Sequence, residues 1–130
     1  MFISKLNLEQ QSVLLALAER IAAADGVSHE KEALLMAALK AQSHDGVAPA
    51  TVELSKLAGV FDSQSAKSAL MLELLGIAFA DSDYHASEKA LVNEVASALS
   101  IDSELLSDME SWVSRQVLLM QEANGFMEDA

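Results

Sequence analysis

The chain has 130 residues, of which 52% are hydrophobic, and its formal net charge is −12 with a pI near 4.4. This length suits one domain that can bury an ordinary core without disulfides, and the hydrophobic content excludes a disordered acidic tail. Only eight residues are Lys or Arg, which argues against binding to DNA or RNA. No apolar run approaches the roughly 18 to 20 residues that span a membrane, so direct membrane insertion is not expected.

The start of the chain and its lack of cysteine bear on the cellular compartment. The first residues, Met1 to Lys5, include no charged segment ahead of a long apolar stretch, so no secretory signal is expected. A chain without cysteine offers neither disulfides nor thiolate ligands, which fits a reducing interior. We therefore expect a cytoplasmic protein.

An amphipathic helix is predicted from Leu8 to Ala24. Asn7 can cap it, with Gln10 at the third helical position, and apolar residues follow at three- and four-residue spacing. Asp25-Gly26 should end this helix, since glycine readily takes the left-handed conformation found just past helix C-termini. A second helix is predicted from about Ser28 or His29 to Gln42.

The segment from His44 to Pro49 is the most loop-like part of the chain, because it combines Asp-Gly with the only proline. After it, a short third helix is predicted through Thr51, Leu54 and Leu57, closed by Gly59. A fourth helix is predicted from Asp62 or Ser63 up to Asp81. Its middle is apolar on nearly all sides, which is typical of a central helix surrounded by others.

Two further helices complete the chain. One is predicted from about Ala86 to Leu99. The last, capped by Asp102 or Ser103, is predicted to run to about Ala123, where Asn124-Gly125 should stop it. No segment alternates polar and apolar residues as a strand would, so the fold class is all-α.

Large side chains at helical spacing are interpreted as core residues. Met71, Met109, Met120 and Met127 fit this interpretation, the alternative being an adaptable binding groove. Trp112 is likewise interpreted as a core aromatic.

An internal repeat organises the chain. Within residues 21–35, seven residues have an identical partner fifty-six positions later, which indicates one helix-turn-helix unit used twice. The pairs are Ile21 with Ile77, Ala22 with Ala78, Ala24 with Ala80, Asp25 with Asp81, His29 with His85, Glu32 with Glu88, and Leu35 with Leu91. We expect residues 1–130 to form one domain, a single compact bundle of six or seven helices. Repeat one covers about 8–42, repeat two about 63–99, and the C-terminal helix about 103–123.

The repeated turn has a purely structural interpretation. Each histidine can occupy the N-cap position of the following helix, with each glutamate at the third helical position. There a carboxylate accepts hydrogen bonds from backbone N–H groups and meets the positive end of the helix dipole. This interpretation needs no ligand.

A second interpretation is a divalent cation site. If the two units pack about a pseudo-twofold axis, both turns lie at the same end of the bundle, and a cation would relieve the repulsion among their carboxylates. Oxygen ligands suit Ca²⁺, Mg²⁺ or Mn²⁺. The spacing is not that of an EF-hand, because the loop is too short and the second copy lacks the turn glycine. The predicted ligands are Asp25, Glu30, Glu32, Asp81, Asp83 and Glu88, with His29 and His85 as weaker candidates that would suit Zn²⁺ or iron instead.

At these residues the chain resembles the TerB family of tellurite resistance proteins, whose helical repeat carries an Ala-Asp-Gly turn followed by a helix that opens with Glu. Ala24-Asp25-Gly26 with Glu30 and Glu32 matches the first copy, and Ala80-Asp81 with Glu88 matches the second. The similarity runs from about Leu8 to Trp112. Ser82 departs from the pattern by replacing the second turn glycine, and His29 and His85 stand where the family more often has a small capping residue.

The resemblance implies a compact helical domain whose acidic residues are proposed to bind metal ions. It also implies a non-catalytic cytoplasmic module of bacterial tellurite resistance or stress response, acting alongside an integral membrane partner. No nucleophile elbow, phosphate loop, dinucleotide fingerprint or zinc protease motif is present in the sequence.

Three functions stay open from the sequence. The first is a non-enzymatic module that binds a divalent cation. The second is an acidic scaffold that meets a basic or membrane-associated protein partner without metal. The third is a hydrolase that uses carboxylates on a bound metal, which would need a concave pocket beside the turns. A homo-oligomer is compatible with all three.

Overall fold

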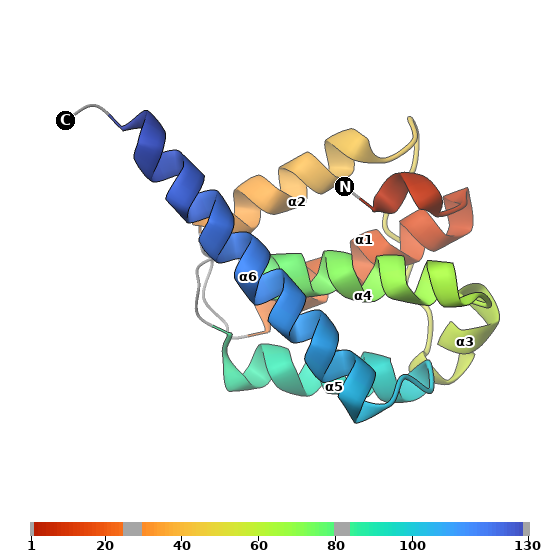
Figure 1. Cartoon of the computed structure of the whole chain (residues 1–130). Coiled ribbons are helices and arrows are strands. Elements are labelled where there is room, and N and C mark those ends of the chain that lie inside the picture. The colour runs from red at the N-terminus through yellow and green to blue at the C-terminus, as the bar shows by residue number, and fades with distance from the viewer. Residues whose placement is uncertain (1, 25–29, 80–83, 129–130) are drawn as a thin grey trace.

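The computed structural model describes residues 2–24, 30–79 and 84–128, and within these ranges every regular element is a helix (Figure 1). This confirms the all-α fold class. The elements are the 3-10 helices η1 (Ile3–Lys5) and η2 (Leu54–Lys56) and the α-helices α1 (Leu8–Ala23), α2 (Glu30–Gln42), α3 (Leu57–Val60), α4 (Gln64–Ala78), α5 (Ala86–Ala98) and α6 (Ser103–Met127). None of these helices is both long and apolar enough to cross a membrane.

Local capping explains where several helices begin. At the start of α1 the Asn7 side chain accepts a hydrogen bond from Gln10 N at 2.8 Å, and the Gln10 side chain accepts one from Asn7 N at 2.9 Å. Ser63 Oγ accepts from Ala66 N at 3.1 Å at the start of α4. Asp102 caps α6 in the same way. These bonds satisfy N–H groups that a helix N-terminus otherwise leaves without a partner.

Helix α4 lies at the centre of the bundle, as its apolar sequence predicts. It contacts α1, α2, α5, α6 and η1. Leu70, Met71, Leu74 and Leu75 have no exposed surface. Burying side chains of this kind contributes roughly 1.5 to 3 kcal/mol each relative to leaving them in water, so α4 supplies much of the hydrophobic stabilisation.

The second helix of each repeat packs against the first helix of both repeats. Helix α2 contacts both α1 and α4, and α5 contacts both α4 and α1, while α1 and α4 form the most extensive helix contact. Helix α2 begins at Glu30 and α5 at Ala86, which reproduces the fifty-six-residue offset of the sequence repeat. The predicted pair of helix-turn-helix units is therefore present in the bundle.

The third helix was predicted too early in the chain. Residues 48–53 are irregular, and only η2 and the single turn of α3 follow. Ala50 N donates a hydrogen bond to Ser12 O in α1 at 3.0 Å. This tertiary bond uses an N–H of the segment expected to open a helix at Pro49.

The end of α6 and its exposure also differ from the prediction. The helix continues through Asn124 and Gly125 to Met127. Gly125 does not take the left-handed conformation of a helix stop, and a glycine inside a helix costs only about 1 kcal/mol relative to alanine. Trp112, interpreted as core, is 39% exposed, and Met120 and Met127 are also exposed.

A buried glutamine joins the chain before α1 to the chain after α2. Gln11 Nε2 donates to Leu6 O at 3.0 Å, and Gln11 Oε1 accepts from His44 N at 2.9 Å. The residue is only 6% exposed. A buried amide is tolerated when its donors and acceptor are used in this way.

Candidate functional site

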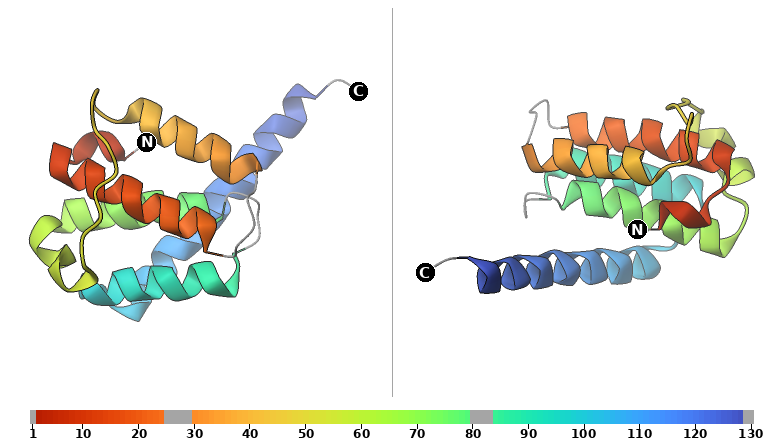
Figure 2. Two further views of the ribbon diagram at one scale, coloured as in Figure 1. Left: turned by 180° about the vertical axis from the view of Figure 1, so that it is seen from behind. Right: turned by 90° about the horizontal axis from the view of Figure 1, so that it is seen from above.

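Both acidic turns are flanked by helix ends that lie at one end of the molecule. The C-terminal ends of α1 and α4 and the N-terminal ends of α2 and α5 are all on this side in every view (Figures 1 and 2). We call this end the acidic pole. The turn residues Asp25, His29, Asp81 and Asp83 lie outside the described residues, so their positions stay a prediction.

Two further predicted ligands belong to the first turn of α2. Glu30 and Glu32 lie in this turn, although their side chains are outside what the structure describes. The positive end of a helix dipole favours carboxylates in a first turn. The backbone therefore places both residues at the acidic pole without fixing what their side chains contact.

Glu88 and His85 are the predicted site residues with described side chains, and both serve the start of α5. His85 is the N-cap residue with extended backbone, and Glu88 occupies the third helical position. Glu88 has no exposed surface, and its Oε1 accepts a hydrogen bond from His85 N at 3.3 Å. The capping interpretation is thus confirmed for this glutamate. A buried carboxylate is costly without such bonds, which explains why Glu88 sits at a helix N-terminus.

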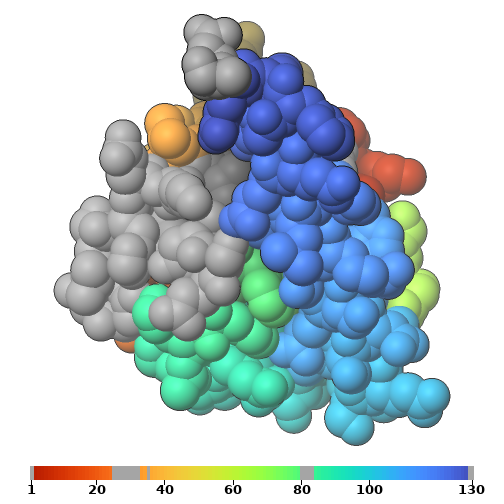
Figure 3. Space-filling view, turned by 60° about the vertical axis from the view of Figure 1, so that its left-hand side comes forward, coloured from red at the N-terminus to blue at the C-terminus, as the bar shows by residue number. Residues whose placement is uncertain are grey.

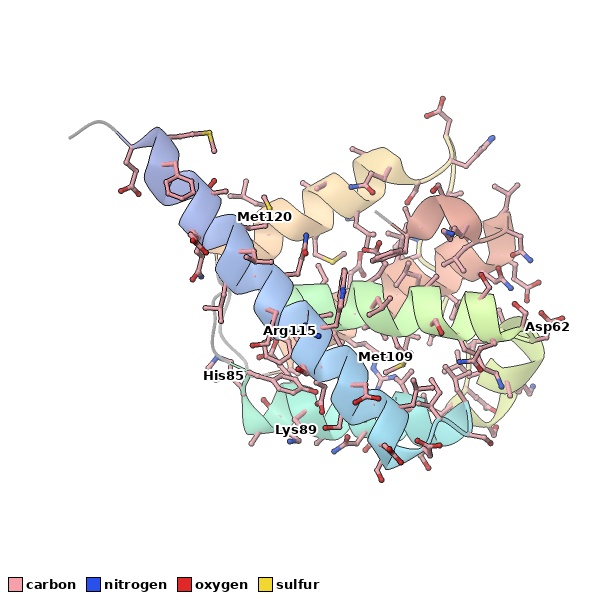
Figure 4. The ribbon with its side chains drawn as sticks, in the orientation of Figure 1. Asp62, His85, Lys89, Met109, Arg115 and Met120 are labelled. Atoms are coloured by element: carbon pink, nitrogen blue, oxygen red, sulfur yellow. The ribbon has the colours of Figure 1, made fainter. Side chains whose placement is uncertain are left out.

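An aromatic residue links this turn to its neighbours. The rings of Tyr84 and Phe79 stack with centroids 4.5 Å apart. Lys89 Nζ lies 5.9 Å from the centroid of the Tyr84 ring, a cation–π distance. Figure 4 shows Lys89 and His85 on the same side of the molecule, toward the N-terminal end of α5.

Glu110, on α6, is a carboxylate of this site that the sequence did not indicate. Burial raises the pKa of the Tyr84 hydroxyl, and the carboxylates of Glu110 and Glu88 raise it further. The Tyr84 hydroxyl and Glu110 Oε2 are both buried atoms, so this carboxylate acts on the hydroxyl with little solvent between them. The negative charge around Tyr84 therefore comes from α6 as well as from the first turn of α5.

The described part of the site does not by itself form a metal centre. Within residues 2–24, 30–79 and 84–128, no three His, Asp or Glu side chains are grouped so that they could hold an ion. A coordination sphere at this pole would have to draw on the turn residues 25–29 and 80–83.

The fold and this pole define a helical module built from paired repeats, with carboxylates concentrated at the inter-helix turns. The family model described as tellurite resistance protein TerB matches residues 16–110, well over half of the chain. The chain therefore belongs to the TerB family, as its acidic turns indicated. No curated protein and no solved structure matches the chain.

Proposed function

We propose that this protein is a non-enzymatic, cytoplasmic TerB-like module that binds a divalent cation at the acidic pole and acts in tellurite resistance or stress response. The observation that carries the proposal is the arrangement of four helix ends, which brings the flanks of both acidic turns to one pole. Glu88 and Glu110 add negative charge around Tyr84 at this pole.

The donor chemistry favours a hard cation. The predicted ligand set supplies six carboxylates from Asp25, Glu30, Glu32, Asp81, Asp83 and Glu88. Ca²⁺ takes six to eight oxygen ligands and Mg²⁺ six, whereas Zn²⁺ prefers nitrogen and sulfur. Mutual repulsion disfavours so many adjacent negative charges, and a bound cation would remove that repulsion.

Calorimetric titration of the chelator-treated 130-residue protein with Ca²⁺, Mg²⁺, Mn²⁺ and Zn²⁺ tests this proposal. We expect heat with an oxygen-preferring ion. The double variant Asp25→Asn with Asp81→Asn should weaken that binding at least about tenfold, which corresponds to about 1.4 kcal/mol.

Asp62→Asn is the matched control, because Asp62 is an exposed aspartate at the opposite end of the molecule from His85 (Figure 4). It should leave the binding unchanged. Absence of heat with all four ions would refute the cation site. Equal weakening by the control would show that the ion responds only to the general charge of the protein.

A second candidate function is an acidic scaffold that binds a basic protein segment, such as a cytoplasmic loop of a membrane protein. The net charge of −12 and the exposed carboxylates of Asp102, Glu104 and Asp108 at the start of α6 favour it. Such binding to a basic peptide should weaken steeply with salt and be insensitive to chelators. Salt-independent binding would count against this candidate.

A further inference from the structure

From Trp112 to Met127, α6 carries an apolar stripe that the bundle covers only in part. Leu119 is 59% exposed, Phe126 82% and Met127 73%. Trp112, Leu119 and Phe126 recur every seven residues, and Met120 and Met127 repeat that interval beside them. Residues at this spacing lie along one side of a helix, and a seven-residue apolar repeat is typical of a surface that packs against another helix. We call these five residues the α6 stripe.

A groove borders the stripe. It lies between α2, α4 and α6, has a volume of about 520 Å³, and is lined by Leu34, Ala38, Ile77, Trp112 and Met120 among others. Leu34, on the α2 side, is itself 63% exposed. Figure 3 shows α6 running along the surface of the molecule up to its C-terminal end. Trp112 and Met120 belong both to the stripe and to the lining of the groove, so the two surfaces adjoin.

We propose that a second copy of this chain covers the α6 stripe, with the two α6 helices packed antiparallel about a twofold axis. In a dimer with twofold symmetry, both copies contribute the same surface patch to the interface. With Leu119 near the axis, Trp112 of each copy lies toward Phe126 of the other, since the two are equally spaced from Leu119. The groove beside Leu34 then receives apolar side chains from the facing helix.

The charge distribution around the α6 stripe favours a second copy of the chain over a basic partner. Between Gln116 and Met127 the only charged residue is Glu122, and the stripe itself contains none. Arg115 and Glu122, four residues before and three after Leu119, lie along the same side of α6, so this patch carries one charge of each sign and gives a basic ligand no net electrostatic attraction. In a chain of net charge −12, it is also a surface where two copies can meet with little repulsion.

The available area matches what a stable dimer needs. Large side chains each carry roughly 150 to 200 Å² of surface, so the exposed fractions of the stripe and Leu34 leave on the order of 700 Å² per copy. A standard interface takes about 800 Å² from each partner. The stripe follows the matched residues 16–110, so membership of the TerB family does not by itself imply it.

Sedimentation equilibrium of the 130-residue protein over a range of concentrations tests the proposal. We expect a reversible dimer that is insensitive to chelators, which separates this test from that of the cation site. Leu119→Lys should raise the dimer dissociation constant at least about 30-fold, the effect of burying a charge at a central contact.

Leu118→Lys is the matched control. Leu118 is 58% exposed but is not three, four or seven residues from any member of the stripe, so it lies on another side of α6. The control should leave dimerisation unchanged, and circular dichroism should show both variants folded. Equal loss of the dimer in both variants would overturn the assignment of this face.

Because the natural chain has no cysteine, single substitutions can report the register. Leu119→Cys should form a disulfide-linked dimer under mild oxidation, and Leu118→Cys should not. A protein that stays monomeric at millimolar concentration would overturn the proposal. Binding of that monomer to anionic lipid vesicles, lost in Leu119→Lys, would assign the stripe to a membrane surface instead.

Discussion

The carboxylate of Glu88, fully buried, accepts a hydrogen bond from the backbone N–H of His85 at 3.3 Å. Both residues belong to the repeated turn, and Glu88 is one of the carboxylates predicted to bind a cation. The bond shows that the start of α5 depends on a side chain that is also one of the proposed cation ligands. A cation at the acidic pole would therefore be coupled to the stability of the start of α5.

Two substitutions of Glu88 distinguish the contribution of its hydrogen bond to stability from the contribution of its charge. Glu88→Ala removes the bond and leaves a cavity, so we expect the free energy of unfolding in urea to fall by about 1 to 3 kcal/mol. Glu88→Gln keeps the oxygen acceptor and the volume, and should cost less than the alanine variant. Glu104→Ala, in the exposed first turn of α6, is the control and should cost under about 1 kcal/mol. Equal losses at Glu88 and Glu104 would contradict this account.

The ionisation of Tyr84 should differ between the folded and unfolded protein. It is the only tyrosine, so its ultraviolet absorbance reports this group alone. Burial and the nearby Glu110 and Glu88 raise its pKa in the folded state, whereas the unfolded chain should titrate near the ordinary value of 10.0. The folded state then holds the proton more tightly above that value, so stability should fall as the pH rises above about 10.

Tyr84→Phe should remove this part of the pH dependence while leaving stability near neutral pH less affected. Urea unfolding of both proteins between pH 8 and pH 11 measures the difference. Ionisation of Tyr84 at the same pH in the folded protein and in urea would disprove the raised pKa.

The cap of α6 is expected to stabilise that helix by a local hydrogen bond. Asp102 Oδ1 accepts from Leu105 N at 2.8 Å. Asp102→Ala should lower stability by about 1 kcal/mol in thermal unfolding, and Asp102→Asn, which retains an acceptor, by a few tenths. Asp108→Ala, an exposed position within the helix, controls for the loss of a charge and should have little effect. A cost at Asp108 equal to that at Asp102 would argue against capping.

Gln11 should be sensitive to substitution despite being polar. Gln11→Leu would leave the N–H of His44 and the carbonyl of Leu6 without their partner, which we expect to cost about 2 to 4 kcal/mol of unfolding free energy. Gln64→Leu, on the exposed first turn of α4, is the matched control and should change stability by less than about 0.5 kcal/mol. A cost below 1 kcal/mol at Gln11 would show that its hydrogen bonds contribute little.

Features set by neighbouring residues could be predicted from the sequence. The caps Asn7, Ser63 and Asp102 act on N–H groups within three residues, so the start of each helix can be recognised locally. The fifty-six-residue repeat predicted the register of α2 and α5 for the same reason. The capping role of Glu88 followed from its distance of three residues from His85.

Features set by tertiary contact could not be predicted. Helical periodicity predicts an apolar face on α6 but does not say whether the bundle covers it, so Trp112 was wrongly assigned to the core. The irregular segment before η2 depends on the bond from Ala50 to Ser12 in another helix. Glu110 approaches Tyr84 only because α6 packs across α4, and no local spacing relates these two residues.

The position of α4 among its neighbours determines how this protein can open. Backbone amides at the centre of α4 can reach solvent only when the surrounding helices separate, so their hydrogen exchange should report global unfolding. Amides in the last turns of α6, beyond most of its packing, can exchange through local fraying instead. Slower hydrogen exchange in those last turns at high protein concentration would show that a partner copy covers them.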